Sequence, residues 1–145
     1  MRQKITDATG AAFDNFGINV SISGSYAIVG AHGDAIGANN GQGSASIYYF
    51  NGISWVLVQK LTDISGAAND RFGINVSISD NYAIVGAYQD NSALGSASIF
   101  LKVGNGWQKL QYVTDPGGNT NDVLGFATAI DAITKRFVIG CFWKN

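Results

Sequence analysis

Residues 16–31 read FGINVSISGSYAIVGA, and residues 72–87 repeat them as FGINVSISDNYAIVGA. The two stretches match at 14 of 16 positions. A third and more divergent copy, LGFATAIDAITKRFVIGC, occupies residues 124–141 and carries two extra residues at its midpoint. Self-similarity at a period near 50 residues is typical of repeat architectures, in which one supersecondary unit is stacked several times.

Landmarks outside this stretch extend the repeat over most of the chain. A Thr-Asp pair ends at Asp7, Asp63 and Asp115. A GSAS run occupies residues 43–46 and 95–98, and a tryptophan follows it at Trp55 and Trp107. Equivalent residues are 56 apart up to Ala31 and 52 apart from Gly43 onward. The difference therefore lies in the connection between the second and third strands of the unit.

Within a unit the hydrophobic period indicates strands. Apolar and polar residues alternate over residues 18–23, which is the pattern of a strand with one apolar face. Residues 26–31 are apolar on both faces, as expected for a strand between two layers. Two further β-rich runs cover residues 44–50 and 55–62, and the links contain turn residues such as Gly24-Ser25 and Asn51-Gly52. Each unit is predicted to be a four-stranded antiparallel meander.

Such a sheet has two apolar faces, so neighbouring sheets must stack on it. Four-stranded sheets repeated radially form a β-propeller. The predicted fold class is therefore all-β, a propeller of four-stranded antiparallel blades with under three blades per chain. A linear stack or an ordinary sandwich is the alternative, although a sandwich rarely repeats a whole four-stranded unit so faithfully.

Composition excludes several classes of function. The net charge is −1 and the nine basic residues form no run, so the sequence lacks the basic footprint of a nucleic-acid or anionic-lipid binder. No stretch of 18 apolar residues is present, which argues against a membrane-spanning helix. The N-terminus has no apolar signal-peptide region. A single cysteine, Cys141, excludes an internal disulfide.

The pairs Phe16-Gly17 and Phe72-Gly73, each followed by Gly-Ala at residues 30–31 and 86–87, resemble the FG-GAP repeat. This repeat builds the propeller of integrin α subunits, and the closer likeness is to bacterial FG-GAP-type repeats. In these terms the chain is a single propeller segment over residues 1–145, with repeat 1 at about 5–60, repeat 2 at about 61–112 and a partial repeat 3 at about 113–145. The third unit departs from the pattern at Leu124 and Cys141.

The resemblance implies a non-enzymatic module for adhesion or for binding a protein or glycan, and an extracellular or cell-surface location. Many integrin-type repeats hold calcium in a loop between the first two strands. Here that place is taken by the tight turns at residues 23–26 and 79–82, which cannot supply the six to eight oxygen ligands that calcium takes. We therefore expect no metal site and no cofactor; a calcium ion shared by Asp63 and Asp70 is the alternative, but no calcium-ligand motif supports it.

The predicted strands fall short of a closed ring. Counting a strand at residues 2–6, four in each full unit and two in the third gives eleven, whereas propellers typically need four to eight blades. Either the chain is part of a longer propeller or several copies complete one ring. We expect a homo-oligomer, in which the N-terminal segment of one copy joins the unfinished third unit of another.

The candidate ligand site lies where the loops entering the first strands meet the loops that join the second and third strands. Loops of this kind carry most binding surfaces. The ligand-binding candidates are His32, Asp34, Tyr88, Asp90 and Asn91. Six aspartates precede the Phe-Gly positions in the entry loops, at residues 7, 14, 63, 70, 115 and 122. Aspartate there more often closes an Asx turn than binds a metal.

No catalytic residue is predicted, because no nucleophile elbow, phosphate loop or flanking carboxylate pair is present. Phe142 and Trp143 lie beyond the last repeat match, and we assign them to a subunit interface, with a sugar-stacking platform as the alternative. Ile5 is assigned to the same interface. Two functions follow: a propeller module that binds a protein or glycan partner, and a structural unit that assembles into a homo-oligomeric ring or array.

Overall fold

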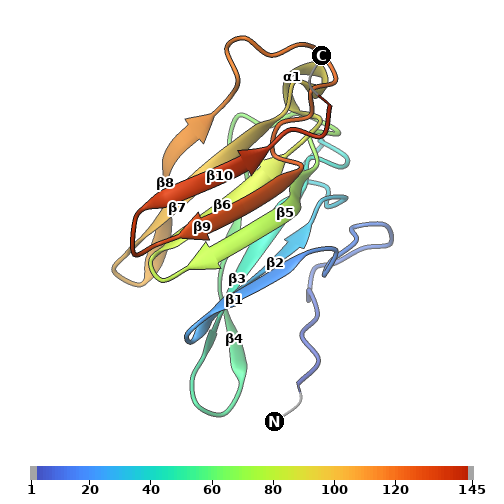
Figure 1. The fold of residues 1–145 in the computed structure, drawn as a ribbon. Coiled ribbons are helices and arrows are strands. Elements are labelled where there is room, and N and C mark those ends of the chain that lie inside the picture. The colour runs from blue at the N-terminus through green and yellow to red at the C-terminus, as the bar shows by residue number, and fades with distance from the viewer. Residues whose placement is uncertain (1–2, 144–145) are drawn as a thin grey trace.

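The computed structural model describes residues 3–143 and contains three antiparallel sheets (Figure 1). Unit 1 consists of β1 (Val20–Ser23), β2 (Tyr26–Ala31), β3 (Ser44–Phe50) and β4 (Trp55–Leu61). Unit 2 consists of β5 (Phe72–Ser79), β6 (Tyr82–Ala87), α1 (Asp90–Ala93), β7 (Ser96–Val103) and β8 (Gly106–Val113). Unit 3 consists of β9 (Ala127–Asp131) and β10 (Arg136–Gly140).

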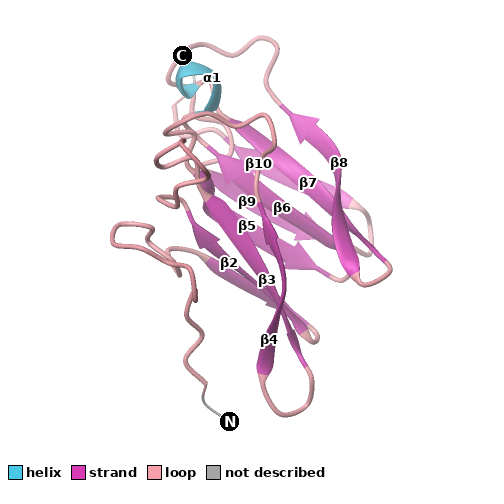
Figure 2. Ribbon diagram, turned by 180° about the vertical axis from the view of Figure 1, so that it is seen from behind, coloured by secondary structure: helices cyan, strands magenta, loops and turns pink. Residues whose placement is uncertain are grey.

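The strands of each unit pair in chain order, β1-β2-β3-β4 and β5-β6-β7-β8. This confirms the predicted all-β fold of four-stranded antiparallel meanders. The sheets do not close into a ring, consistent with an incomplete propeller. The hairpin turns lie at one end of the molecule, and the entry loops with the β2–β3 and β6–β7 connections lie at the other, here called the loop end (Figure 2). No helix among residues 3–143 is long and apolar enough to cross a membrane.

The three sheets stack face to face, with unit 2 in the middle. Its β6 is buried on both faces: Val85 belongs to a core shared with Ile28 and Ile47 of unit 1, whereas Ile84 packs toward Ile130 of unit 3. This confirms that the second strand of the unit lies between two layers. Burial of an aliphatic side chain of this size contributes about 1.5–3 kcal/mol.

The unit 1–unit 2 and unit 2–unit 3 joints are formed by backbone contacts between glycines. A Cβ added at Gly30 would lie 2.0 Å from the carbonyl oxygen of Gly73, and one added at Gly86 would lie 1.9 Å from that of Gly125. Gly73 and Gly125 have φ values of 91° and 88°, a left-handed region that favours glycine. The Phe-Gly pair of one unit thus fits against the Gly-Ala pair of the preceding unit.

Polar residues of the inner strands also join the units, a role that the sequence alone did not reveal. The side chains of Asn19, directly before β1, and of Ser21 in β1 accept hydrogen bonds from the backbone N–H groups of Val76 (3.2 Å) and Ile78 (3.1 Å) in β5. Asn75 in β5 in turn accepts from the backbone N–H of Thr128 (2.9 Å). Backbone N–H groups on the free edge of an inner strand are thereby hydrogen-bonded by side chains of the preceding unit.

The strand expected at residues 2–6 is wrong: residues 3–6 have no regular structure, and Arg2 lies outside the described residues. The segment nevertheless lies at an outer-strand position. Gln3 accepts a hydrogen bond from Trp55 N (2.7 Å) and donates one to Trp55 O (3.4 Å). Gln59 makes the same two contacts with Trp107, at 2.8 and 3.0 Å. Gln3 is therefore the counterpart of Gln59, without sheet neighbours to hold it as a strand.

The glycine joint can be tested by Gly86→Ala. Because its Cβ would overlap backbone that no rotamer change can move, we expect a loss of about 3 kcal/mol of unfolding free energy. Gly140 is the matched control, since a Cβ there would lie 3.4 Å from Ala127 Cβ, which is ordinary contact. Denaturant titration in dilute solution should show Gly140→Ala within about 0.5 kcal/mol of the parent. Equal losses for both variants would contradict the assignment.

Candidate binding site at the loop end

The aspartates of the entry loops close turns, as the sequence indicated. Asp63 Oδ1 accepts from the backbone N–H of Ser65 (3.1 Å), and Asp7 and Asp115 make the same contact two residues on. Asp70 Oδ2 accepts from the N–H of Ala67, three residues back. The equivalent residues Asp14 and Asp122 do likewise. These carboxylates fix the shape of the loops.

In unit 1 a single lysine pairs with one of these carboxylates, Asp7, and with Asp34 of the β2–β3 connection. Lys60 Nζ lies 2.6 Å from Asp34 Oδ2 and 3.0 Å from Asp7 Oδ2. Ser44 donates a further hydrogen bond to Asp34 (2.6 Å). Burial lowers the pKa of Lys60, but the hydrogen bonds to Asp34 and Asp7 outweigh it and raise the pKa above its ordinary value. Asp34 is thus buried and engaged within the protein.

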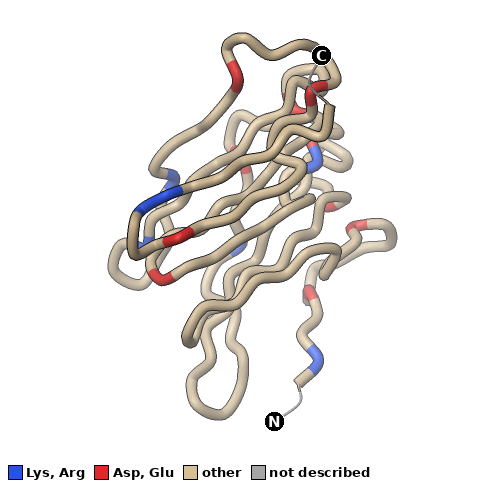
Figure 3. The backbone as a smooth tube through the Cα atoms, in the orientation of Figure 1, with Lys and Arg blue, Asp and Glu red and all other residues tan. Residues whose placement is uncertain are grey.

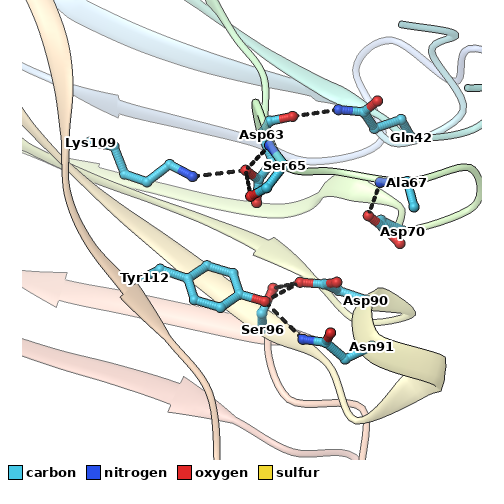
Figure 4. A network of polar contacts seen from close by, with 10 residues as sticks. All are labelled: Gln42, Asp63, Ser65, Ala67, Asp70, Asp90, Asn91, Ser96, Lys109 and Tyr112. Atoms are coloured by element: carbon cyan, nitrogen blue, oxygen red, sulfur yellow. Dashed lines mark hydrogen bonds and ion pairs between the residues drawn. The ribbon is translucent and has the colours of Figure 1, made fainter.

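In unit 2 the two corresponding carboxylates, Asp90 and Asp63, are contacted by two different side chains (Figure 4). Tyr112 stands at the position of Lys60 and donates its hydroxyl hydrogen to Asp90 Oδ2 (2.5 Å). Lys109, which is not at an equivalent position, pairs with Asp63 (2.8 Å). Asn91 donates to the Tyr112 hydroxyl (2.9 Å), so Asp90 and Asn91 are held by one phenol.

The pKa shifts in this region follow from burial and from these contacts. Burial raises the pKa of Tyr112 to about 12, and the hydrogen bond to Asp90 adds to the rise. Burial also raises the pKa of Asp70, helped by the charges of Asp90 and Asp63. For Asp63, burial acts upward, but the hydrogen bonds from Lys109 and Ser65 lower the pKa. The electrostatic potential around Asp70 is therefore negative.

A cavity of about 600 Å3 opens between the entry loop of unit 2 and α1, and we call it the unit 2 cavity. Seven of its ten lining residues carry amide, hydroxyl or carboxylate groups, namely Ser65, Asn69, Asp70, Gln89, Asp90, Asn91 and Ser92, and the other three are alanines at 67, 68 and 93. Gln42 of unit 1 donates to Asp63 O (2.6 Å) and fixes the entry loop from behind.

The other wall of the cavity is a left-handed turn. Asn91 and Ser92 in α1 have φ values of 52° and 60°. The next residue, Ala93, has φ 64°, as does its unit 1 counterpart Gly41. The carbonyl of Ala93 accepts from the N–H groups of Asn121 (2.9 Å) and Val123 (3.1 Å), so the entry loop of unit 3 holds the turn in place. Strained backbone of this kind persists only where its surroundings fix it.

The equivalent place in unit 1 differs in shape and chemistry. Its connection, residues 32–43, is four residues longer than residues 88–95. The cavity there is about 420 Å3, and its lining includes Phe13 and Arg71. His32 does not line it: its Nδ1 is buried without a hydrogen-bond partner among the described residues, and burial lowers its pKa, with a contribution from the charge of Arg71.

The structure brings some of the predicted ligand residues together and separates others. Asp90 and Asn91 line the unit 2 cavity, whereas Asp34 is buried in the unit 1 ion pair. Tyr88 begins a chain of ring contacts, with Phe126 at 5.8 Å, then Phe142 at 5.0 Å and Trp143 at 5.1 Å. The C-terminal aromatic residues predicted as an interface therefore lie at the loop end, near α1 (Figure 1).

Several residues of the site were not identified from the sequence. Gln89 and Asn69 line the cavity, and Tyr112 and Lys109 support it from β8. A signal existed for Tyr112, because a tyrosine replaces Lys60 at an otherwise repeated position. Among residues 3–143, no group of three or more His, Cys, Asp or Glu side chains is placed to hold a metal ion. Charged residues are scattered along the chain, with no continuous basic strip in the view of Figure 3.

Comparison with protein families matches the FG-GAP repeat over residues 1–50 and again over residues 55–100. The chain belongs to the FG-GAP repeat family. The resemblance expected from the Phe-Gly and Gly-Ala pairs is thereby confirmed. Comparison with curated proteins finds no match to this chain. In this FG-GAP protein the Phe-Gly and Gly-Ala residues are the two halves of the joint between units.

The unequal ion-pair networks predict unequal effects of removing their lysines. Lys60→Met leaves the buried carboxylate of Asp34 and the partly buried carboxylate of Asp7 without a cation, so we expect a loss of about 2 kcal/mol of unfolding free energy. Lys109→Met removes the cation from Asp63 alone and should lower the unfolding free energy by about 1 kcal/mol. Because the pKa of Asp63 is lowered on folding, the Lys109→Met penalty is full above pH 3.8 and vanishes as the pH falls through the folded pKa. Denaturation at several pH values measures both; a larger penalty for Lys109→Met would contradict this account.

The phenol of Tyr112 predicts a distinct loss of stability at high pH. A raised folded pKa means that its stabilising contribution is complete below pH 10 and is lost as the pH rises from 10 to about 12. Over this interval the unfolding free energy of the parent should fall more steeply than that of Tyr112→Phe. Tyr49→Phe is the matched control, because Tyr49 is equally exposed and lies outside the loop-end network. Parallel pH profiles for the parent and Tyr112→Phe would exclude the proposed role.

Proposed function

We propose that this protein is a non-enzymatic propeller-type binding module whose ligand site is the unit 2 cavity. The cavity itself carries the proposal, since it is built from the one connection in which units 1 and 2 differ. The Tyr112–Asp90–Asn91 contacts hold its wall before any ligand binds. Such preorganisation reduces the cost of ordering side chains on binding.

The lining favours a polyhydroxylated ligand, and we propose a glycan. Carboxylate and amide oxygens accept hydrogen bonds from sugar hydroxyls, and the amide N–H groups of Asn69, Gln89 and Asn91 can donate to sugar oxygens. The electronegative surroundings of Asp70 disfavour an anionic ligand. A glycan carried on another protein or on a cell surface also fits the expected role in adhesion and an extracellular location. FG-GAP repeats are generally non-enzymatic and typically extracellular, which supports this proposal.

Binding can be tested by filling the cavity. Ala68 lines it and is exposed, so Ala68→Trp should occupy the space without disturbing the core. On a glycan array we expect a defined set of neutral oligosaccharides to bind the parent, and Ala68→Trp to reduce binding at least tenfold, about 1.4 kcal/mol.

Ala12→Trp is the matched control, because Ala12 is the equivalent residue of unit 1 and lines the smaller cavity there. It should leave glycan binding unchanged. Binding that survives Ala68→Trp, or that is lost equally in both variants, would place the site elsewhere. An array on which the parent binds no oligosaccharide would exclude the glycan proposal.

A further inference from the structure

The two outer faces of the stack expose residues whose counterparts are buried inside it. Val20 and Ile22 of β1 are 64% and 65% exposed, whereas their unit 2 counterparts Val76 and Ile78 are 4% exposed because unit 1 covers them. At the other end, Val138 of β10 is 65% exposed, whereas its counterpart Ile84 is fully buried. The outer face of unit 1 is thus of the kind that a preceding unit covers, and the outer face of unit 3 is of the kind that a following unit covers.

Each outer face also carries one unpaired half of the glycine joint. Gly17 keeps a φ of 90°, as in Gly73, yet a Cβ there would meet nothing within 4 Å. Gly140 is the counterpart of Gly30 and Gly86, and no Gly carbonyl lies against it. The Phe-Gly turn is therefore already formed at one end, and its receiving position is open at the other.

We propose that copies of this chain associate head to tail, with the Phe16-Gly17 turn of one copy seated on Gly140 of the next. The occupant is a second copy because the same pair of surfaces already meets twice within the chain, at Gly30–Gly73 and at Gly86–Gly125. The new contact repeats those joints with the same residue types. In this arrangement the segment at residues 3–6, held by Gln3 on Trp55, takes the outer-strand position of unit 3 in the neighbouring copy, separated from β10 by one strand position.

The aromatic residues at the C-terminus fit the same contact. Within the chain, Tyr88 packs on Phe126 across the joint between units 2 and 3. Phe142 is the repeat counterpart of Tyr88, and Ile18 is the counterpart of Phe126. Phe142 and Ile18 are 59% and 51% exposed. Head-to-tail association places Ile18 of one copy against Phe142 of the next, which covers both side chains.

One element of the internal joints is missing at this contact. The residues that would accept hydrogen bonds from the next inner strand are Asn19 and Ser21 in unit 1, but Ala127 and Ala129 in unit 3. The backbone N–H of Val20 in the second copy would therefore lack the acceptor that Val76 finds in Asn19. The contact between copies is accordingly weaker than the joints within the chain, and it can be strengthened by restoring that acceptor.

Sedimentation velocity of the full chain over a concentration series tests the proposal. We expect the parent to associate at micromolar concentration, either as one closed species or as a growing series, since a head-to-tail contact gives rings or filaments. Gly140→Ala should weaken association at least a hundredfold, because its Cβ would overlap the Gly17 carbonyl of the neighbour. Gly117→Ala is the control, since Gly117 lies in a loop away from both faces and a Cβ there has room.

Ala127→Asn provides a test by gain of association. A side-chain acceptor at this position should tighten association about fivefold, as expected for one added hydrogen bond. A parent chain that stays monomeric at all concentrations would overturn the proposal. So would association that Gly140→Ala leaves intact, because the copies would then meet through another surface.

Discussion

The stack depends on the close approach of backbone between units at Gly30–Gly73 and Gly86–Gly125. At these points the absence of a Cβ lets a carbonyl oxygen of one unit enter the surface of the preceding one. That approach brings the apolar faces of the sheets within packing distance, so the buried core around Val85 and Ile28 follows from it. It also brings the inner strands close enough for Asn19 and Asn75 to reach backbone N–H groups of the next unit.

The loop end is less constrained than the joints and is where the units diverge. The aspartates that shape the entry loops are repeated in all three units, but their partners are not: one lysine in unit 1 is replaced by a tyrosine and a displaced lysine in unit 2. Because the joints hold the scaffold, a connection can lose four residues and form a cavity without altering the sheets. Constant joints and variable loops are a common basis for binding surfaces on repeat folds.

Most of the fold could be predicted from the sequence, because the strands show either alternation or a short apolar run and because each unit is repeated. The joint between units could not be predicted in the same way. Asn19 and Ser21 look like solvent-facing residues of a half-buried strand, and only the position of the neighbouring strand shows that they bind backbone. The segment at residues 3–6 matches an outer strand in sequence, yet lacks the neighbours that would make it one.

The candidate site could be predicted only in part, because its contacts also depend on how neighbouring strands are positioned. Asp90 and Asn91 lie at the loop end, as the sequence predicted, and line the cavity there. Asp34, the unit 1 counterpart of Asp90, is instead buried in an ion pair with Lys60. Lys109 reaches Asp63 from a position offset from Lys60, beyond a register shift in the β7–β8 pairing. The same register shift occurs in the β3–β4 pairing, where Leu57 stands at the position of Lys109, so comparison of the repeats could not reveal this contact.

Among residues 3–143, the hydrogen bonds between the inner strands of different units are donated by the later unit and accepted by side chains of the earlier one. The Gln59–Trp107 pair follows the same order, with the earlier unit supplying the side chain. The unit that is synthesised first therefore carries the acceptor side chains to which the next unit binds. Because translation proceeds from the N-terminus, the acceptor side chains of each joint are synthesised before the N–H groups that bind to them.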